Sequence, residues 1–298
     1  MRSWLLFKSK NLKIALHPFF LLFVFLWLLA GLPLESFLLF LLVLGHELAH
    51  LLAAKFYGIK IKKIELLPFG GVGYLSQPLE INPRAEFFVA GAGPAFNLMV
   101  ALFMWNYGAG AYFTPVGGWS LPSFLLRANI FLFFFNLLPG LPLDGGRMLR
   151  ASLSPRLGFF GATEKAALCG KALGVFFASL GIALSYFDYM QLTLSLMGLF
   201  LYYAAGREQQ STVYVFLRYL LRKEKMLRKA RVLKSEQLVA LENTTVLEVL
   251  KQFKPARYHQ VIVLNRSMRV LELLSESQIL GAALQKGMDI PLQRLLQK

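Results

Sequence analysis

Two histidines and a glutamate occur together in the short run His46-Glu47-Leu48-Ala49-His50. On a helix, residues four positions apart project from the same face, so the two imidazoles can bind one metal ion. Glu47 lies between them, where its carboxylate would accept a proton from an attacking water. The residue types and their spacing therefore predict metal-assisted hydrolysis with Glu47 as the general base.

The run lies inside an apolar segment, because Ser36–Phe56 has almost no other polar side chains. Ionisable side chains at membrane depth are costly and usually functional. In a soluble protein the same five residues would fit a solvated surface helix, but a membrane setting removes that explanation. The setting therefore favours a metal site.

A catalytic zinc ion usually has three protein ligands and one open position. Asp144 is the best candidate for the third ligand, since Asn136–Gly146 is rich in proline and glycine and follows a predicted span. Of the other histidines, His17 suits a membrane boundary and His259 lies in the polar C-terminal region. As an alternative, Asp144 could cap a helix that begins at Gly145.

The composition indicates a polytopic membrane protein. Of the 298 residues, 56% are hydrophobic, and the mean hydropathy is +0.54. The single Cys169 excludes an internal disulfide and a cysteine-rich zinc site. We expect six spans of bilayer length, at Ile14–Leu32, Ser36–Phe56, Glu86–Tyr107, Pro122–Leu138, Thr163–Phe187 and Tyr189–Ala205.

Lysine and arginine are concentrated in alternate loops between these spans. The positive-inside rule then places both termini in the cytoplasm. His46, His50 and Asp144 fall on that same side. The net charge of +16 follows the cytoplasmic loops, which favours contact with anionic membrane lipid and argues against nucleic acid as a partner.

Apolar and polar residues alternate on both sides of Pro68–Gly71, so Ile59–Leu75 is predicted to form a short β-hairpin that dips toward the membrane. A substrate strand added beside this hairpin would replace hydrogen bonds lost by an unwound helix, with Gly70 and Gly71 in contact with it. The alternative is a plain cytoplasmic loop.

The C-terminal part of the chain is more polar. Residues 207–230 are predicted to form a basic linker, either on anionic lipid or as a solvated helix flank. Residues 231–298 are predicted to form a small α/β domain, because Thr245–Glu248 and Ser275–Gln278 fit capping boxes. Two strands are expected between these helix starts, at Gln260–Leu264 and Met268–Leu274.

The combination of the histidine run in one span and Asn-x-x-Pro-x-x-Pro-Leu-Asp-Gly from Asn136 resembles the site-2 protease family of intramembrane zinc metalloproteases. This resemblance implies that His46, His50 and Asp144 bind one Zn²⁺ and that Glu47 is the catalytic base. It also implies that residues 1–206 form the metalloprotease domain.

A further segment, Ala92-Gly93-Pro94-Ala95-Phe96-Asn97, is similar to the Ala-Gly-Pro-x-x-Asn segment of that family. Asn97 and Asn136 would then face the cleft and hold an unwound substrate backbone. Hydrogen bonding between helices is the alternative for both asparagines.

Within the family, the chain is most similar to the stage IV sporulation protein FB group, in Leu67–Gly71, in Leu141–Gly146 and in a C-terminal domain similar to a CBS module. The resemblance implies a sigma-factor precursor as the protein substrate and regulation by other membrane proteins. It implies a location in the bacterial cell membrane or the forespore outer membrane. It also implies ATP at the CBS-like domain, which would require a homo-oligomer or a partner because one such module is visible.

The expected fold is therefore mainly α, with a six-span helical membrane domain, a membrane-dipping β-hairpin and a small α/β CBS-like domain. A transporter or channel with a regulatory tail is the alternative, because intramembrane ionisable residues also mark ion pathways. The sequence lacks the internal symmetry common in transporters. A catalytically inactive scaffold is disfavoured because the set of candidate ligands and base is intact.

Overall fold

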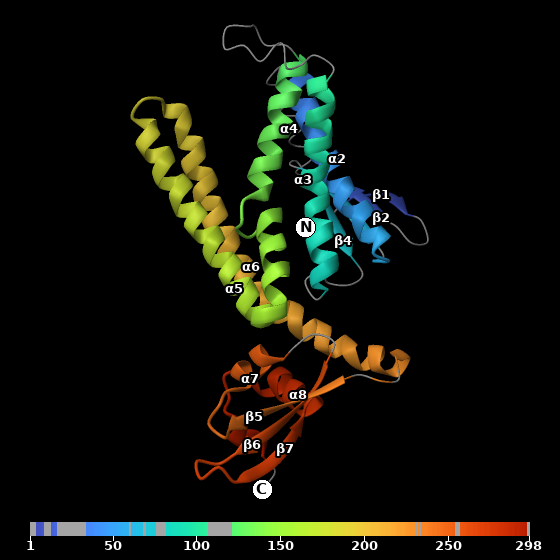
Figure 1. The fold of residues 1–298 in the computed structure, drawn as a ribbon, viewed down its shortest axis with the longest axis vertical. Helices are drawn as coiled ribbons and strands as arrows, with labels where there is room; N and C mark the ends of the chain where they lie inside the picture. The colour runs from blue at the N-terminus through green and yellow to red at the C-terminus, as the bar shows by residue number, and fades with distance from the viewer. Residues whose placement is uncertain are drawn as a thin grey trace.

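The computed structural model describes residues 4–8, 13–16, 34–59, 61–67, 70–75, 82–106, 121–230, 232, 234–253 and 257–296. The described chain is mainly helical, and Figure 1 shows a helical part above a smaller α/β part. The helices are α2 (Leu34–Phe56), α3 (Pro83–Asn106), α4 (Leu121–Leu137), α5 (Asp144–Ser185), α6 (Leu192–Ala230), α7 (Val246–Gln252) and α8 (Glu276–Lys286), with 3-10 helices η3 (Tyr189–Gln191) and η4 (Leu292–Leu295). The strands are β1 (Trp4–Lys8), β2 (Lys13–Leu16), β3 (Ile61–Leu67), β4 (Gly70–Leu75), β5 (Lys234–Leu241), β6 (Arg257–Leu264) and β7 (Val270–Ser275).

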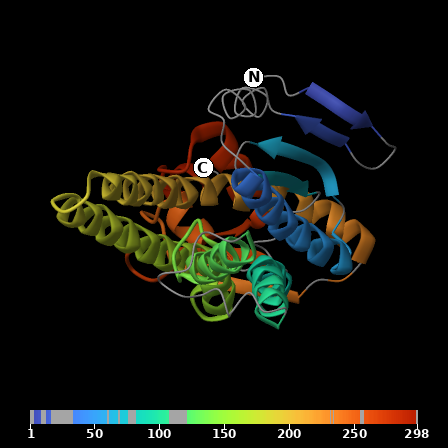
Figure 2. The same cartoon turned by 90° about the horizontal axis from the view of Figure 1, so that it is seen from above.

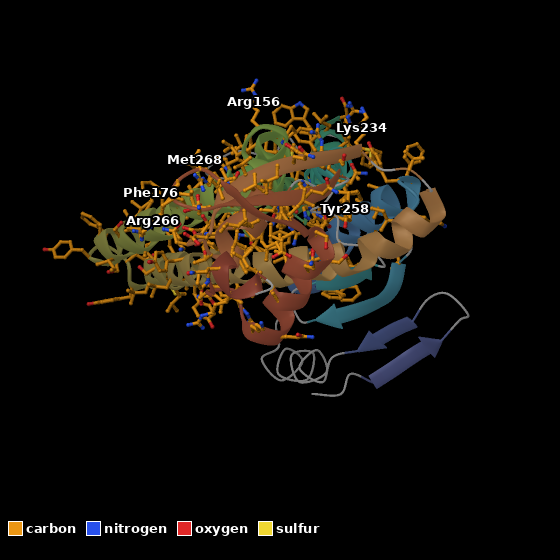
Figure 3. All side chains as sticks on the ribbon, turned by 90° about the horizontal axis from the view of Figure 1, so that it is seen from below. Arg156, Phe176, Lys234, Tyr258, Arg266 and Met268 are labelled. Atoms are coloured by element: carbon orange, nitrogen blue, oxygen red, sulfur yellow. The ribbon has the colours of Figure 1, made fainter. Side chains whose placement is uncertain are left out.

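Three described helices are long and apolar enough to cross a membrane, within α2, α3 and α5, and α4 is a shorter apolar helix. Large apolar side chains on these helices are exposed: Leu52 is 68% exposed, Phe134 63% and Phe176 56%, the last labelled in Figure 3. Exposed apolar surface on this scale is unfavourable in water and normal against lipid. The chain is therefore a membrane protein.

The predicted spans agree with the helices in three places and need correction in one. The second, third and fourth spans coincide with α2, α3 and α4 to within a few residues. The fifth overlaps the second part of α5 and ends two residues beyond it, and the sixth covers η3 and the start of α6. The first was predicted to begin at Ile14, but Lys13–Leu16 forms β2, because a short apolar run does not distinguish strand from helix. Residues 17–33 of that span lie outside the described residues, so the count of six spans stays a prediction.

Helix α5 consists of two helical parts joined at Gly158. This residue has φ 70°, in the left-handed region that glycine adopts without steric cost. Figure 1 shows α5 as two helical parts that run in different directions. The first part begins with Asp144, and the second packs beside α6 in both Figure 1 and Figure 2.

The predicted β-hairpin is confirmed by the antiparallel pairing of β3 with β4. The hairpin belongs to a larger sheet of order β1-β2-β3-β4, in which β2 pairs parallel with β3 and antiparallel with β1. Among the described residues, β4 has β3 as its one strand neighbour and also contacts α2. An edge strand of this sheet thus lies beside the helix that carries the two candidate histidines.

The C-terminal part contains a three-stranded sheet in which β5 pairs parallel and β7 antiparallel with β6. Both predicted capping boxes are confirmed, at Thr245 before α7 and at Ser275 before α8. One hydrophobic core joins α7, α8 and the sheet, and it includes Phe159, which is 2% exposed. Phe159 comes from α5, directly after Gly158, so the bend in α5 and the C-terminal part share a single core.

Candidate metal centre

Helix α2 brings His46 and His50 onto one face. The ring centroids lie 4.7 Å apart, and His46 is 5% exposed. The helix is unbroken from Leu34 to Phe56 because the segment contains apolar and helix-forming residues and no proline. The four-residue spacing predicted from the sequence is therefore realised as two adjacent imidazoles.

Asp144 is the first residue of α5, and its carboxylate points at both rings. Its Oδ2 lies 3.0 Å from His46 Nε2 and 3.1 Å from His50 Nε2. The two Nε2 atoms are 3.1 Å apart. The N-cap of α5 is Leu143, which makes no side-chain cap bond, so the carboxylate of Asp144 is directed at the histidines rather than at the helix end.

These three donor atoms fit a zinc ion. They form a nearly equilateral triangle, and a tetrahedral ion with bonds of about 2.0–2.1 Å separates its ligand atoms by about 3.3 Å. The neighbouring position on α3 is Gly93, where a Cβ atom would overlap Nε2 of both rings. Helix α3 thus leaves a space free of side chain beside the donors. Two imidazoles and a carboxylate are also a donor set that zinc prefers.

The hydrogen bonds of the rings leave both Nε2 atoms free to bind metal. His50 Nδ1 donates to the main-chain oxygen of Val89 at 2.7 Å. His46 Nδ1 donates to Oδ1 of Asn97 at 2.5 Å. A carbonyl oxygen accepts but does not donate, so each bond keeps the ring proton on Nδ1 and the lone pair on Nε2.

Glu47 is half-buried on the same helix. Its carboxyl group interacts electrostatically with both histidine rings and with Asp144. Glu47 is not one of the three converging donors, and its role as general base stays a prediction.

The two asparagines that the sequence singled out differ in their surroundings. Asn97 is 0% exposed and is bonded to His46 through Oδ1 and to Asn129 through Nδ2. Asn136 is half-buried and donates to the oxygen of Leu132 within α4 at 3.0 Å. The bond from Asn97 to Asn129 joins two helices, as the alternative interpretation expected. Their contact with substrate stays a prediction.

Gly70 and Gly71 begin β4, opposite Leu67 and Leu66 of β3. Their predicted contact with substrate also stays a prediction. His259 is buried in the C-terminal part, where its ring stacks on Phe253. His17 lies outside the described residues.

The sequence did not identify an ion pair that ties α3 to α5. Arg150 and Glu86 are 3% and 2% exposed, and Arg150 donates to Glu86 Oε1 from Nε at 2.9 Å and from Nη2 at 2.5 Å. Glu86 lies one turn before Val89 on α3, and Arg150 lies fewer than two turns after Asp144 on α5. The ion pair therefore holds together the helix whose backbone binds His50 and the helix that carries Asp144. Arg150 lies between the predicted fourth and fifth spans, and charge alone does not show which arginine of such a segment is buried.

The sequence matches Peptidase family M50 over residues 35–114 and 114–180, which include both histidines, Glu47 and Asp144. It is 36% identical over 217 residues to zinc metalloprotease MJ0392 of Methanocaldococcus jannaschii, a match that spans 70% of this chain and 60% of that protein. It is 31% identical over 286 residues to stage IV sporulation protein FB of Bacillus subtilis, across 95% of this chain and 94% of that protein. The solved structure of a site-2 protease from M. jannaschii is similar with a TM-score of 0.52 and 34% identity, over 70% of this chain and 95% of that chain.

Proposed function

This chain belongs to peptidase family M50, the site-2 protease family of zinc metalloproteases, and from that premise we propose that it hydrolyses one peptide bond of a protein substrate near the cytoplasmic membrane face. The observation that carries the proposal is the convergence of three donor atoms, 3.0–3.1 Å apart, among apolar helices. In this proposal His46, His50 and Asp144 hold Zn²⁺, and Glu47 is the general base.

The chemistry follows from these positions. Zinc held by the three donors would polarise the scissile carbonyl and lower the pKa of the attacking water to about 7. Glu47 takes a proton from that water at a carboxylate oxygen while the water oxygen bonds to the carbonyl carbon. Glu47 then returns the proton to the amide nitrogen as the carbon–nitrogen bond breaks, which releases an amine and a carboxyl group.

The Nδ1 bonds to Asn97 and Val89 keep the two rings oriented during these steps. The ion pair between Glu86 and Arg150 keeps α3 and α5 together. The metal centre thus keeps its geometry while the substrate changes conformation, because a helical substrate segment must unwind before its carbonyl groups can be attacked.

Strand β4 is the proposed place for the unwound segment, since one of its edges has no strand neighbour among the described residues. Replacing both Gly70 and Gly71 with valine is expected to slow cleavage and leave zinc binding intact. Added side chains would hinder the approach of a substrate strand to the backbone of β4. Initial rates of cleavage and zinc per chain are the two measurements.

The matched control is Gly281→Val on α8, where a Cβ atom would meet open space. It is expected to cleave at the ordinary rate. If the Gly70/Gly71 variant also cleaves at the ordinary rate, substrate does not add to this strand.

We propose a polytopic arrangement of six spans with both termini in the cytoplasm, supported by the alternation of lysine- and arginine-rich loops. The similarity to a stage IV sporulation protein supports a role in sporulation. The resemblance to that group further implies a sigma-factor precursor as substrate, in the cell membrane or the forespore outer membrane.

Co-expression tests this substrate class. The chain would be produced with a membrane-associated sigma-factor precursor in one strain and with an unrelated single-span protein in another, and the length of each substrate followed by immunoblot. Shortening of the precursor, and not of the unrelated protein, is expected. Shortening of the unrelated protein alone would refute the sigma-factor substrate.

We also propose that residues 207–230 are a basic linker and residues 231–298 a CBS-like domain. Support comes from the helix that continues to Ala230 and from the order β5-α7-β6-β7-α8. A docking role for substrate, an ATP site, a homo-oligomer and regulatory membrane partners follow from the resemblance and stay predictions.

A further inference from the structure

Two asparagines lie deep among apolar helices, Asn97 on α3 and Asn129 on α4, and both are 0% exposed. Burial of a carboxamide is unfavourable unless its donor and acceptor groups are paired. Asn129 was not singled out from the sequence, although an asparagine within the apolar run of α4 is the kind of residue that needs a reason.

The two carboxamides form a directed chain of hydrogen bonds. Asn129 Nδ2 donates to the main-chain oxygen of Leu125 at 2.8 Å. Asn97 Nδ2 donates to Asn129 Oδ1 at 3.0 Å. Asn97 Oδ1 in turn accepts from His46 Nδ1 at 2.5 Å. This series of hydrogen bonds therefore runs from a backbone carbonyl on α4, through α3, to a candidate metal ligand on α2.

The direction of this series of hydrogen bonds is fixed at its α4 end. The Leu125 oxygen can only accept, so Asn129 must face it with nitrogen and must offer its oxygen to Asn97. Asn97 must then offer nitrogen to Asn129 and oxygen to His46. The proton of His46 is thereby kept on Nδ1, away from the metal side of the ring.

His46 and His50 are secured in different ways. The Nδ1 of His50 is bonded directly to a backbone oxygen, which can only accept a hydrogen bond. The Nδ1 of His46 is bonded to a carboxamide, which could turn over and present its NH₂ group. That turn would move the ring proton to Nε2, where it would point at the other two donors.

We propose that Asn129 is a positioning residue for the metal centre: acting through Asn97, it keeps the lone pair of His46 Nε2 directed at the bound ion. This inference rests on the proposed function only in taking His46 as a zinc ligand. Asn129 itself contacts neither the donors nor substrate in this role.

Zinc affinity of the purified full-length chain, measured by competition with a chelator, tests the proposal separately from cleavage. Asn129→Leu removes the acceptor for Asn97 and is expected to weaken zinc binding about 10–100-fold, the usual cost of losing an outer partner of a metal ligand. Asn129→Asp retains that acceptor, and as the neutral acid its hydroxyl can donate to the Leu125 oxygen, so this variant is expected to bind zinc nearly as the unchanged chain does.

A rescue variant separates orientation from general packing. Asn97→Asp places oxygen atoms on both sides of the group, so it can accept from His46 in either orientation. Asn97→Asp combined with Asn129→Leu should therefore recover most of the affinity lost in Asn129→Leu alone. A merely structural role for Asn129 predicts no recovery.

Thr163→Val is the matched control, because Thr163 is also buried and also bonds to the carbonyl four residues earlier, at Phe159, without a link to His46. Its zinc affinity should be unchanged. Thermal unfolding of the metal-free proteins checks folding, and Asn129→Ala replaces Asn129→Leu if the latter does not fold. Unchanged zinc affinity in Asn129→Leu, or in Asn129→Ala where it replaces that variant, would overturn this inference alone. Absence of zinc binding by the unsubstituted protein would overturn the proposed function.

Discussion

Replacement of Glu47 with glutamine is expected to abolish cleavage while the protein keeps its zinc. Glutamine has nearly the same shape but cannot accept a proton at neutral pH. A positioned general base contributes about 10²–10⁴-fold to a rate, so the residual activity should fall below detection in a co-expression assay. Zinc content should stay the same because Glu47 is not among the three converging donors.

The measurement is the time course of substrate shortening alongside the zinc content of the same preparations. Glu164→Gln, an exposed glutamate on α5, is the matched control and should cleave normally. Ordinary cleavage by Glu47→Gln with zinc bound would remove the assignment of the base. Solute flux without cleavage by the unchanged chain would instead favour the transporter alternative.

Replacement of Asp144 with asparagine is expected to remove both zinc and activity. The change keeps the volume of the side chain but takes away the charged oxygen that lies 3.0 and 3.1 Å from the two rings. The loss of zinc affinity should exceed the roughly 10–100-fold that follows from removing outer partners, because a direct ligand is lost. A chelator should also stop cleavage by the unchanged chain, and added zinc should restore it there but not in Asp144→Asn.

Asp188→Asn provides the comparison, since Asp188 caps η3 at the α5–α6 connection and should retain both zinc and activity. Equal zinc affinity in Asp144→Asn and in the unchanged chain would mean that the carboxylate is not a ligand. The metal would then be held by the two histidines and a group on the chain not yet assigned.

The candidate donors were accessible from the sequence because two of them lie four residues apart and the third lies in a segment that resembles a family motif. His46 and His50 lie about one helical turn apart. Asp144 is an acidic residue in a proline- and glycine-rich segment at the end of a predicted span. The structure brings these three together. The capping boxes at Thr245 and Ser275 were predictable for the same reason, since each depends on residues three apart.

The sequence did not predict features that depend on contacts between residues far apart along the chain. Strand β2 pairs parallel with β3, about fifty residues later, and one lysine followed by three apolar residues does not reveal such a pairing. Asn129 acts through Asn97 on another helix, and Arg150 through Glu86. The bend at Gly158 was also missed, because this residue lies between the predicted fourth and fifth spans, where no continuous helix was expected.

The ring of Phe159 makes the C-terminal part incomplete without the middle of the chain. A fragment that begins at residue 207 would lack one of its core aromatic side chains, and loss of a buried phenylalanine costs about 3–5 kcal/mol. Binding measured on such a fragment would therefore be that of a domain with a cavity in its hydrophobic core. In the whole chain the same ring lies 5.9 Å from the Arg150 guanidinium carbon, so it also connects this core to the ion pair that joins α3 to α5.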